Sequence, residues 1–480
     1  MSAAVARRMA GAICVLLVAG APASGVARTA WVARFTFKSG LDAAGVAAAV
    51  SPDGKRVYVL GSGDDSRTVR RDHISDYATV AYNAATGAKI WVARYKTNGS
   101  NNPHGIAVSR DAARVYVTGD NGKGVAATVA YKAANGAQLW VARSAMFEMY
   151  GAGSSDVIGV SPDGTTVYIS GYGENVHSGA PSAGSGPVVV LAYKAKNGTD
   201  AWVARYPASK EYYDNATPQA LTLSPDGRTV YVLVNWVGHA FPGAFLTLAY
   251  DAATGALRWS AQYKGAVRST PTGIAVNPDG SGVYVTGDTL FLHPTGPDEY
   301  ATVDYDAATG TQRWQARYHD PHNQPRGATA EEIAVSPDGT RVYVSGESAN
   351  SSGNGFDYVT AAYSTKTGAE LWLTRSIQQA RNNDGAVSAL ATSPDGTKVF
   401  VVATTSSKRS SGLTLAYYSA TGRQLWLNRY AAPENRDASL DAIAISPDGS
   451  KVYVTGEVGV SGSRPGANSN VCATIAYRVG

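Results

Sequence analysis

The stretch "AYDAATGALRW", residues 249–259, recurs six more times along the chain and decides its fold. Every copy carries a Thr-Gly or Asn-Gly pair followed, four residues after its Gly, by a Trp, so the chain is built from internal repeats. The other copies span residues 81–91, 130–140, 192–202, 304–314, 362–372 and 416–426.

A second repeated element alternates with the first, beginning with "VSPDGKRVYVLG" at Val50. One copy, "VSRDAARVYVTG" at Val108, is degenerate in the Pro-Asp-Gly part. Successive copies lie 52 to 63 residues apart, and their eight landmark residues are Ser51, Ser109, Ser161, Ser224, Asn277, Ser336, Ser393 and Ser446.

Each repeat unit predicts four β-strands. A short strand precedes the Pro-Asp-Gly turn, and "RVYVTG" then alternates Val and Tyr with the period of two that a strand requires. A third strand ends at the Thr-Gly turn, and the strand around the Trp is the fourth. Four strands repeated every 50 to 60 residues are typical of propeller blades around a central channel.

Eight of the nine Trp residues occupy the same repeat position, which also predicts how the ring closes. Trp31 belongs to "TAWVARF" and has no repeat motif ahead of it, whereas the last unit, "CATIAYRVG", has no Trp strand. We therefore expect the N-terminal strand to complete the eighth blade and remove the open sheet edge. The eight Trp residues are Trp31, Trp91, Trp140, Trp202, Trp259, Trp314, Trp372 and Trp426. The predicted fold is all-β, a single eight-bladed propeller of four-stranded blades.

The first repeated element, the one that ends in Trp, resembles the tryptophan-docking motif of quinoprotein-type, or PQQ-like, eight-bladed propellers. Its pattern is matched in full at Ala249, Asp251, Thr254, Gly255 and Trp259. The "SPDGxxVYVTG" half resembles the YVTN-type propeller repeat. The resemblance implies that each Trp packs against the Thr-Gly turn of the next blade, which gives these residues a structural role.

The N-terminus has the features of a secretion signal over residues 1–27, with Arg7 and Arg8 before an apolar run and small residues at the cleavage region. The apolar run is too short to span a bilayer. We expect residues 28–480 to form one exported, monomeric domain in which Cys472 has no partner for an intrachain disulfide. The net charge of +5 and the absence of a long basic run argue against nucleic-acid binding.

The loops between strands 2 and 3, and those between blades, vary in length and all emerge on one face, which we call the variable face. Function in loop-bearing scaffolds gathers on such a face. Seven Tyr residues fall there outside the repeat positions: Tyr77, Tyr150, Tyr172, Tyr212, Tyr213, Tyr300 and Tyr358. The ninth Trp, Trp236, lies beside His239. With Tyr212 and Tyr213 they are candidates for an aromatic-lined ligand pocket; the alternative is that polar aromatics merely populate long loops.

The mouth of the central channel is a second candidate site. The residue five before each landmark opens the first strand of a blade, and His104, Asp156, Glu331 and Asp441 stand there among Val46, Gln219, Thr272 and Ser388. They form a polar ring that suits a cation or a polar substrate group, or simply a solvated lining. An Arg three residues after the Trp recurs in seven blades, which indicates a structural role: Arg34, Arg94, Arg143, Arg205, Arg317, Arg375 and Arg429.

These observations favour a non-catalytic propeller that binds a protein or cell-envelope ligand through its variable face, with no cofactor. An outer-membrane assembly factor with the same repeat is the precedent that the resemblance supplies. The alternative is a dehydrogenase that holds PQQ and Ca²⁺ at the channel mouth, as the resembling enzymes do. Those enzymes also carry a vicinal disulfide, which the single Cys472 of the mature chain excludes. No Gly-x-Ser-x-Gly, His-Glu-x-x-His or phosphate-loop motif indicates another enzyme class.

Overall fold

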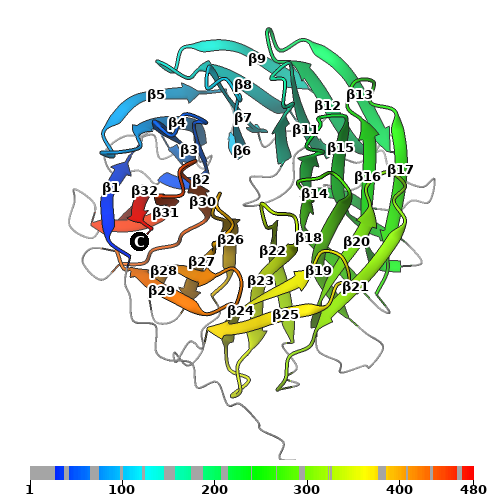
Figure 1. Ribbon diagram of the computed structural model, residues 1–480. Coiled ribbons are helices and arrows are strands. Elements are labelled where there is room, and N and C mark those ends of the chain that lie inside the picture. Colours follow the sequence, from blue (N-terminus) through cyan, green and yellow to red (C-terminus); the bar gives the residue numbers. More distant parts are fainter. Residues whose placement is uncertain are drawn as a thin grey trace, which may run out of the picture.

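The computed structural model describes residues 27–36, 43–64, 75–97, 101–121, 125–144, 157–173, 187–206, 215–238, 241–265, 268–290, 298–322, 324, 327–376, 385–406, 409–432, 436–461 and 468–479. Within these ranges the chain forms 32 β-strands in eight four-stranded antiparallel sheets. The sheets stand around a common axis as the blades of a propeller (Figure 1). The predicted all-β, eight-bladed fold is confirmed.

The first four blades follow one another in chain order, and each begins with its innermost strand. Blade 1 contains β2 (Ala43–Val50), β3 (Arg56–Asp64), β4 (Ser75–Asn83) and β5 (Lys89–Tyr95), and blade 2 contains β6 (Asn102–Val108), β7 (Arg114–Asp120), β8 (Ala126–Lys132) and β9 (Gln138–Ser144). Blade 3 contains β10 (Ile158–Val160), β11 (Thr166–Tyr172), β12 (Val188–Lys194) and β13 (Asp200–Tyr206), and blade 4 contains β14 (Asn215–Leu223), β15 (Thr229–Gly238), β16 (Phe241–Asp251) and β17 (Leu257–Tyr263).

The remaining blades continue the ring in the same order, except that the outermost strand of the last blade comes from the N-terminal part of the chain. Blade 5 contains β18 (Arg268–Val276), β19 (Gly282–Leu290), β20 (Asp298–Asp306) and β21 (Gln312–Tyr318), and blade 6 contains β22 (Ala328–Val335), β23 (Arg341–Ala349), β24 (Phe356–Ser364) and β25 (Glu370–Ser376). Blade 7 contains β26 (Val387–Thr392), β27 (Lys398–Ser406), β28 (Ser410–Tyr418) and β29 (Gln424–Tyr430), and blade 8 contains β30 (Ala442–Ile445), β31 (Lys451–Ser461), β32 (Asn468–Arg478) and β1 (Thr29–Phe35).

Ring closure joins the two ends of the described chain in blade 8. Strand β1 pairs antiparallel with β32, with Val32 opposite Ile475 and Phe35 opposite Cys472. Because β1 supplies the outermost strand of blade 8, the last blade has the same four strands as the others, and the predicted closure is confirmed.

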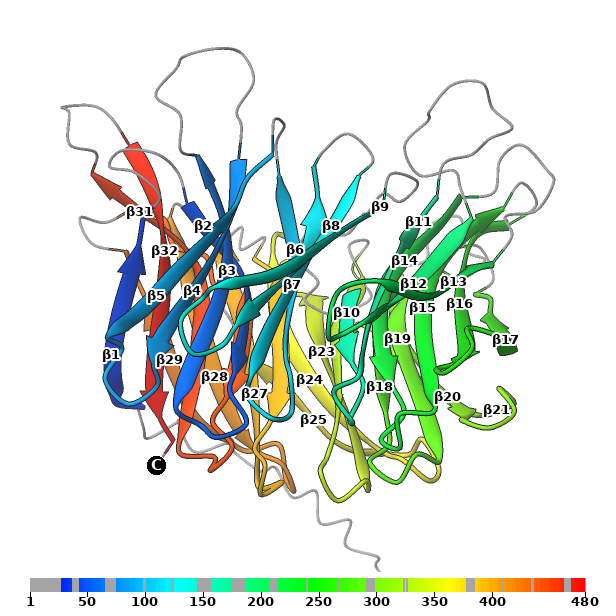
Figure 2. The same cartoon turned by 90° about the horizontal axis from the view of Figure 1, so that it is seen from above.

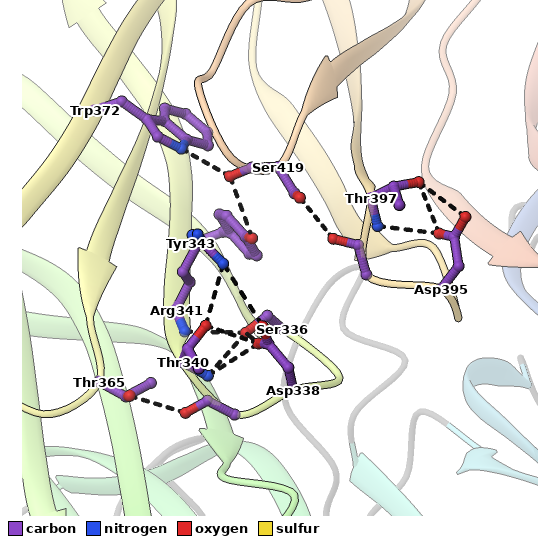
Figure 3. Close-up of polar contacts among 12 residues, drawn as sticks. Ser336, Asp338, Thr340, Arg341, Tyr343, Thr365, Trp372, Asp395, Thr397 and Ser419 are labelled. Carbon is purple, nitrogen blue, oxygen red and sulfur yellow. Dashed lines mark hydrogen bonds and ion pairs between the residues drawn. The ribbon is translucent and has the colours of Figure 1, made fainter.

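The docking Trp residues join neighbouring blades, as the resemblance implied. Trp259 of blade 4 is 8% exposed, and its Nε1 donates to the backbone oxygen of Ala307 in blade 5 at 3.0 Å. Its ring lies so close to Gly310 that a Cβ there would be 2.6 Å from the indole, so this turn position accepts only glycine. Figure 3 shows the same arrangement two interfaces further on, between blades 6 and 7, where Trp372 and Tyr343 both donate to the backbone oxygen of Ser419.

Seven of the eight docking residues donate in this way to the next blade: Trp31, Trp91, Trp140, Trp202, Trp259, Trp314 and Trp372. Trp426 is buried as well, but its Nε1 has no hydrogen-bond partner among the described residues. Its neighbour is blade 8, whose third and fourth strands come from opposite ends of the chain and share no Thr-Gly turn. The exception therefore follows from the way the ring closes.

The two faces of the ring differ as predicted. Short turns between strands 1 and 2, and between strands 3 and 4, lie together along the lower edge in Figure 2. The opposite edge, where the second strand of a blade ends and the third begins, is the variable face. Residues 1–26 of the predicted signal region, residues 1–27, also lie outside the described residues. In the part of the chain that the structure describes, no helix is long and apolar enough to cross a membrane.

Candidate functional site

The ring of candidate residues around the axis occupies one structural position, a β-bulge in the innermost strand. In six blades the pairing of the first strand with the second shifts by one residue at this position. A bulge leaves the extra residue unpaired and re-aims its side chain. The bulge residues are Val46, His104, Gln219, Thr272, Glu331 and Ser388, and all six are partly exposed.

Blades 8 and 3 contain the remaining two candidate residues of this ring. Asp441 lies directly before β30 and is partly exposed, whereas Asp156 of blade 3 lies outside the described residues. The sequence placed all eight residues at the start of their strands. That holds for Asp441 but is wrong for residues such as Glu331, which lies in the middle of β22, because the bulge falls inside the strand.

A second set of side chains, at the end of the second strand, links blades 5 to 8, each to the next. Asp288 Oδ1 accepts from the backbone N–H of Ala330 at 2.8 Å, and Thr404 Oγ1 accepts from that of Leu440 at 3.1 Å. Glu347 Oε1 accepts from the backbone N–H of Val387 in the same way. These hydrogen bonds join blades 5 to 8 near the axis. The polar groups around the channel therefore also stabilise the ring.

Glu331 and Glu347 form the most perturbed pair of this region. Burial raises the pKa of Glu331 to about 7. Burial, reinforced by the charge of Glu331, raises the pKa of Glu347 well above its usual value. Glu347 is 5% exposed, and its other oxygen accepts from Thr329 Oγ1 at 3.4 Å. The two carboxyl groups hold a proton at neutral pH because their full ionisation would place two negative charges together in a poorly solvated site.

Blade 8 contains a similar pair of carboxyl groups with a smaller pKa shift. Burial, together with the charge of Glu457, raises the pKa of Asp441 to about 6. Ser439 Oγ donates to Asp441 Oδ2 at 3.4 Å, which favours the charged form. Blade 7 separates this pair from Glu331 and Glu347, and contributes Ser388, whose hydroxyl donates to the backbone oxygen of Leu440 at 2.5 Å.

His104 belongs to a hydrogen-bonded pair within blade 2. Its Nε2 lies 2.6 Å from Asp120 Oδ2, and Asn102 Nδ2 donates to Asp120 Oδ1 at 3.1 Å. A carboxylate can only accept, so His104 carries a proton on Nε2. Three members of the predicted polar ring, His104, Glu331 and Asp441, thus each interact with a carboxyl group of their own blade, whereas Ser388 contacts the next blade.

Trp236 lies near the end of β15 on the variable face. It is partly buried and meets Tyr206 of blade 3 edge to face, with ring centroids 6.0 Å apart. His239, Tyr212 and Tyr213, the other members of the predicted aromatic pocket, lie outside the described residues. The pocket itself stays a prediction.

Three of the Tyr residues assigned to the variable face prove to be packing residues. Tyr77, Tyr300 and Tyr358 are at most 1% exposed. Their hydroxyls donate to backbone oxygens of the next blade, at Asp120, Glu347 and Thr404 respectively. The assignment was wrong because these Tyr lie between blades, where a strand position near the loops is still fully covered.

A charged network on the variable face was not predicted from the sequence. The side chain of Asp320, which follows β21, is fully buried and accepts from the backbone N–H of Gln324 at 2.9 Å and from Ser348 Oγ at 3.1 Å. Arg375 of blade 6 lies 3.4 Å from the same carboxylate and 3.2 Å from Asp357. The segment after blade 5 is thereby fastened to blade 6.

His322 extends this network toward solvent, with its side chain 34% exposed. Arg375 Nη1 lies 3.1 Å from its Nδ1. The same nitrogen lies 3.5 Å from Asp320 Oδ1, so the imidazole adjoins both members of the network. The only hint in the sequence was the singular composition of "YHDPHNQP", residues 318–325, because Arg375 itself occupies a repeated position.

The repeated Arg has the expected structural role in the blades where its contacts are described. Arg143 Nε donates to Tyr95 at 2.9 Å, and Arg34 donates to Tyr430 at 3.2 Å, each across a blade interface. Arg375 differs because it holds the carboxylates of the variable-face network.

The described residues do not supply the ligand set that Ca²⁺ with PQQ requires. Within them, no group of three or more His, Cys, Asp and Glu side chains could hold a metal ion. Both oxygens of Glu347 already accept protein hydrogen bonds, and blade 7 stands between Glu331 and Asp441. Ca²⁺ needs six to eight oxygen ligands at one point. We therefore derive no chemistry through this cofactor.

The fold and its docking contacts define a PQQ-like eight-bladed propeller. The family model described as "Outer membrane protein assembly factor BamB" matches residues 75–235 and 188–458, and the chain belongs to this family. No curated protein matches the chain significantly.

Solved structures share the fold at low sequence identity. BamB from Moraxella catarrhalis is 14% identical with a TM-score of 0.50, over 95% of this chain and 100% of that chain. Sqt1 from Chaetomium thermophilum, bound to the N-terminus of the ribosomal protein L10, is 14% identical with a TM-score of 0.57, over 94% and 100%. Quinohemoprotein alcohol dehydrogenase from Comamonas testosteroni is 14% identical with a TM-score of 0.50, over 93% and 76%. These similarities establish the fold alone.

Proposed function

We propose that this protein is an exported, non-catalytic propeller that binds a protein or cell-envelope ligand through its variable face. Two lines of support come from outside the variable face itself. The family to which the chain belongs is described by an outer membrane protein assembly factor. The N-terminal residues have the pattern of a secretion signal.

The observation that carries the proposal is the network of Asp320, Arg375 and Asp357. Long loops bind partners well when a rigid scaffold holds their ends, because less conformational freedom is lost on binding. The buried carboxylate of Asp320 and the guanidinium of Arg375 fix the segment after β21 on blade 6. They leave His322 exposed beside them as a single, non-repeated polar group. These fixed ends support the proposal of a preorganised contact surface.

Site-specific photo-crosslinking in the native host tests the proposal. A benzoylphenylalanine replaces His322 on the variable face and, as the matched control, the exposed Thr309 in a turn on the opposite face. We expect one discrete crosslinked species from position 322 and none from position 309. The double substitution Asp320→Asn with Arg375→Met should abolish the crosslink by releasing the segment.

The dehydrogenase alternative is tested on the same purified protein by adding PQQ and Ca²⁺. We expect neither tight binding, measured by absorbance and thermal shift, nor dye-linked oxidation of alcohols or sugars. Submicromolar PQQ binding, or turnover that a chelator abolishes and Ca²⁺ restores, would overturn the proposal.

A further inference from the structure

The face opposite the variable loops carries a girdle of Pro–Gly contacts between neighbouring blades. At five interfaces the Pro of one Pro-Asp-Gly turn lies against the Gly of the turn in the next blade, whereas Gly339 of blade 6 meets the side chain of Asn277. A Cβ built on Gly280 would lie 3.7 Å from Pro225 Cδ, and one on Gly396 would lie 3.6 Å from Pro337 Cδ. Gly54, Gly227 and Gly449 meet Pro447, Pro162 and Pro394 in the same way. The contact is thus a repeated apolar element of this face.

Blade 2 interrupts the girdle. Its turn contains Arg110 in place of Pro and Ala112 in place of Gly. Ala112 has φ of 56°, the only positive φ of a non-glycine residue in the described ranges, and this conformation is unfavourable for a residue with a Cβ. In the next blade a Cβ built on Gly164 would have no atom within 4 Å. The space above Gly164 is open, whereas a proline ring fills it at five other turns and the Asn277 side chain fills it at Gly339.

A hollow of about 450 Å³ lies next to this open space, between blades 3 and 4. Its lining includes Arg110, Pro162, Asp163, Tyr168, Trp202 and Asp226. Arg110 therefore takes part in both features, because it replaces the missing Pro and also lines the hollow. Among the glycines of the described Pro-Asp-Gly turns, Gly164 alone would have no atom within 4 Å of an added Cβ, and such a local departure is a mark of a functional position.

The lining combines apolar walls with one guanidinium that has no partner among the described residues. The hydroxyl of Tyr168 and Nε1 of Trp202 both donate to the backbone oxygen of Ala252, at 3.0 and 2.9 Å, so these rings offer apolar surface and no free donor. Arg110 makes no hydrogen bond or ion pair with the described residues, which leaves its five N–H donors for a ligand.

Two carboxylates complete the chemistry of the hollow. Hydrogen bonds from Ser161 and Ser224 lower the pKa of Asp163 and Asp226 respectively, so both are ionised at neutral pH. Asp226 also lies 3.8 Å from Arg228. A ligand that carries a positive charge beside an apolar, carbonyl-rich segment matches this lining.

We propose that this hollow binds an extended, proline-containing segment of a partner protein. One proline ring of the segment occupies the open space above Gly164 and restores the contact that Pro225 makes with Gly280. Carbonyl groups of an extended segment, which has no internal hydrogen bonds, accept from Arg110. Asp163 and Asp226 favour a basic residue next to the proline. The site lies on the face opposite the variable loops, so its failure would leave the proposed function untouched.

Fluorescence anisotropy with labelled peptides tests this proposal on the intact mature protein. The probe is a lysine followed by eight prolines, compared with a lysine followed by four Ala-Ser pairs and with a glutamate followed by eight prolines. We expect saturable binding of the lysine–proline peptide, and binding at least tenfold weaker for each of the other two. Equal binding of the Ala-Ser peptide, tighter binding of the glutamate peptide or no saturable binding would overturn the proposal.

Matched variants localise the binding. Arg110→Pro with Ala112→Gly rebuilds the repeated turn, so we expect a higher Tm together with at least tenfold weaker peptide binding. Arg110→Ala, which leaves the backbone of the turn unchanged, should weaken binding as well. Arg423→Ala removes an exposed Arg that stacks on Tyr418 in a turn of blade 7 and should leave binding unchanged. Unchanged binding in both Arg110 variants would refute the site.

Discussion

Replacement of Trp259 by Ala tests whether the docking Trp residues hold the ring together. Trp259 stacks near Tyr231 and Tyr305, with ring centroids 5.8 and 6.4 Å away, and covers Gly310. Removing the indole leaves a cavity between blades 4 and 5 and takes away the hydrogen bond to the oxygen of Ala307. Both effects destabilise the folded state without touching the variable face.

The size of the loss follows from the buried area. A buried Trp removes about 150–250 Å² from water, which at about 25 cal/mol/Å² corresponds to about 4–6 kcal/mol. Residual burial in the unfolded chain lowers this value by about 10–40%. We therefore expect Trp259→Ala to lower the free energy of unfolding by about 3–5 kcal/mol, in the range of large-to-small core substitutions. Trp259→Phe keeps most of the packing and should lose about half as much.

Trp236→Ala is the matched control, because this Trp lies outside the docking pattern. It is partly buried and contacts Tyr206 edge to face, so we expect a loss below about 2 kcal/mol. Urea unfolding followed by circular dichroism, with Tm from calorimetry, measures all three variants. Equal losses for Trp259→Ala and Trp236→Ala would refute the distinction between the docking residues and the candidate ligand site.

Two further predictions concern closure and the axial carboxylates. Deletion of residues 28–36 removes β1 and leaves β32 as an exposed edge, so the protein should aggregate or melt at a much lower temperature; a truncated protein that melts like the intact one would contradict the closure seen in blade 8. Glu331 has a folded-state pKa of about 7, raised from 4.5. Its contribution to stability is therefore full below about pH 4.5 and is lost as the pH rises through 7. Glu331→Gln, which stays neutral, should raise the free energy of unfolding at pH 8 relative to the native protein by about 1–3 kcal/mol and flatten its decline between pH 5 and 8; parallel pH profiles of the two proteins would show that Glu331 is not the titrating group.

Much of the fold could be predicted because the determining signals are local and repeated. The period-two strands, the Pro-Asp-Gly and Thr-Gly turns and the Trp all fall within one unit of about 50–60 residues. The Trp31 segment without a preceding motif and the last unit without a Trp then required that the ends meet in blade 8. The candidate site could be predicted only in part from such signals. Glu331 and Asp441 were identified, but the sequence did not show that each interacts electrostatically with a second carboxyl group of the same blade.

Strand periodicity by itself determined which residues form blades, how many blades there are and where the ring closes. The tertiary structure alone decided which side chains meet across blades. A one-residue bulge shifts the register inside the first strand, so alternation no longer tells which face Glu331 occupies. Arg375 repeats in the sequence like its equivalents, yet it alone among them meets Asp320, which follows the last strand of the preceding blade. Contacts between blades depend on the relative placement of whole sheets, which no short stretch of one repeat encodes.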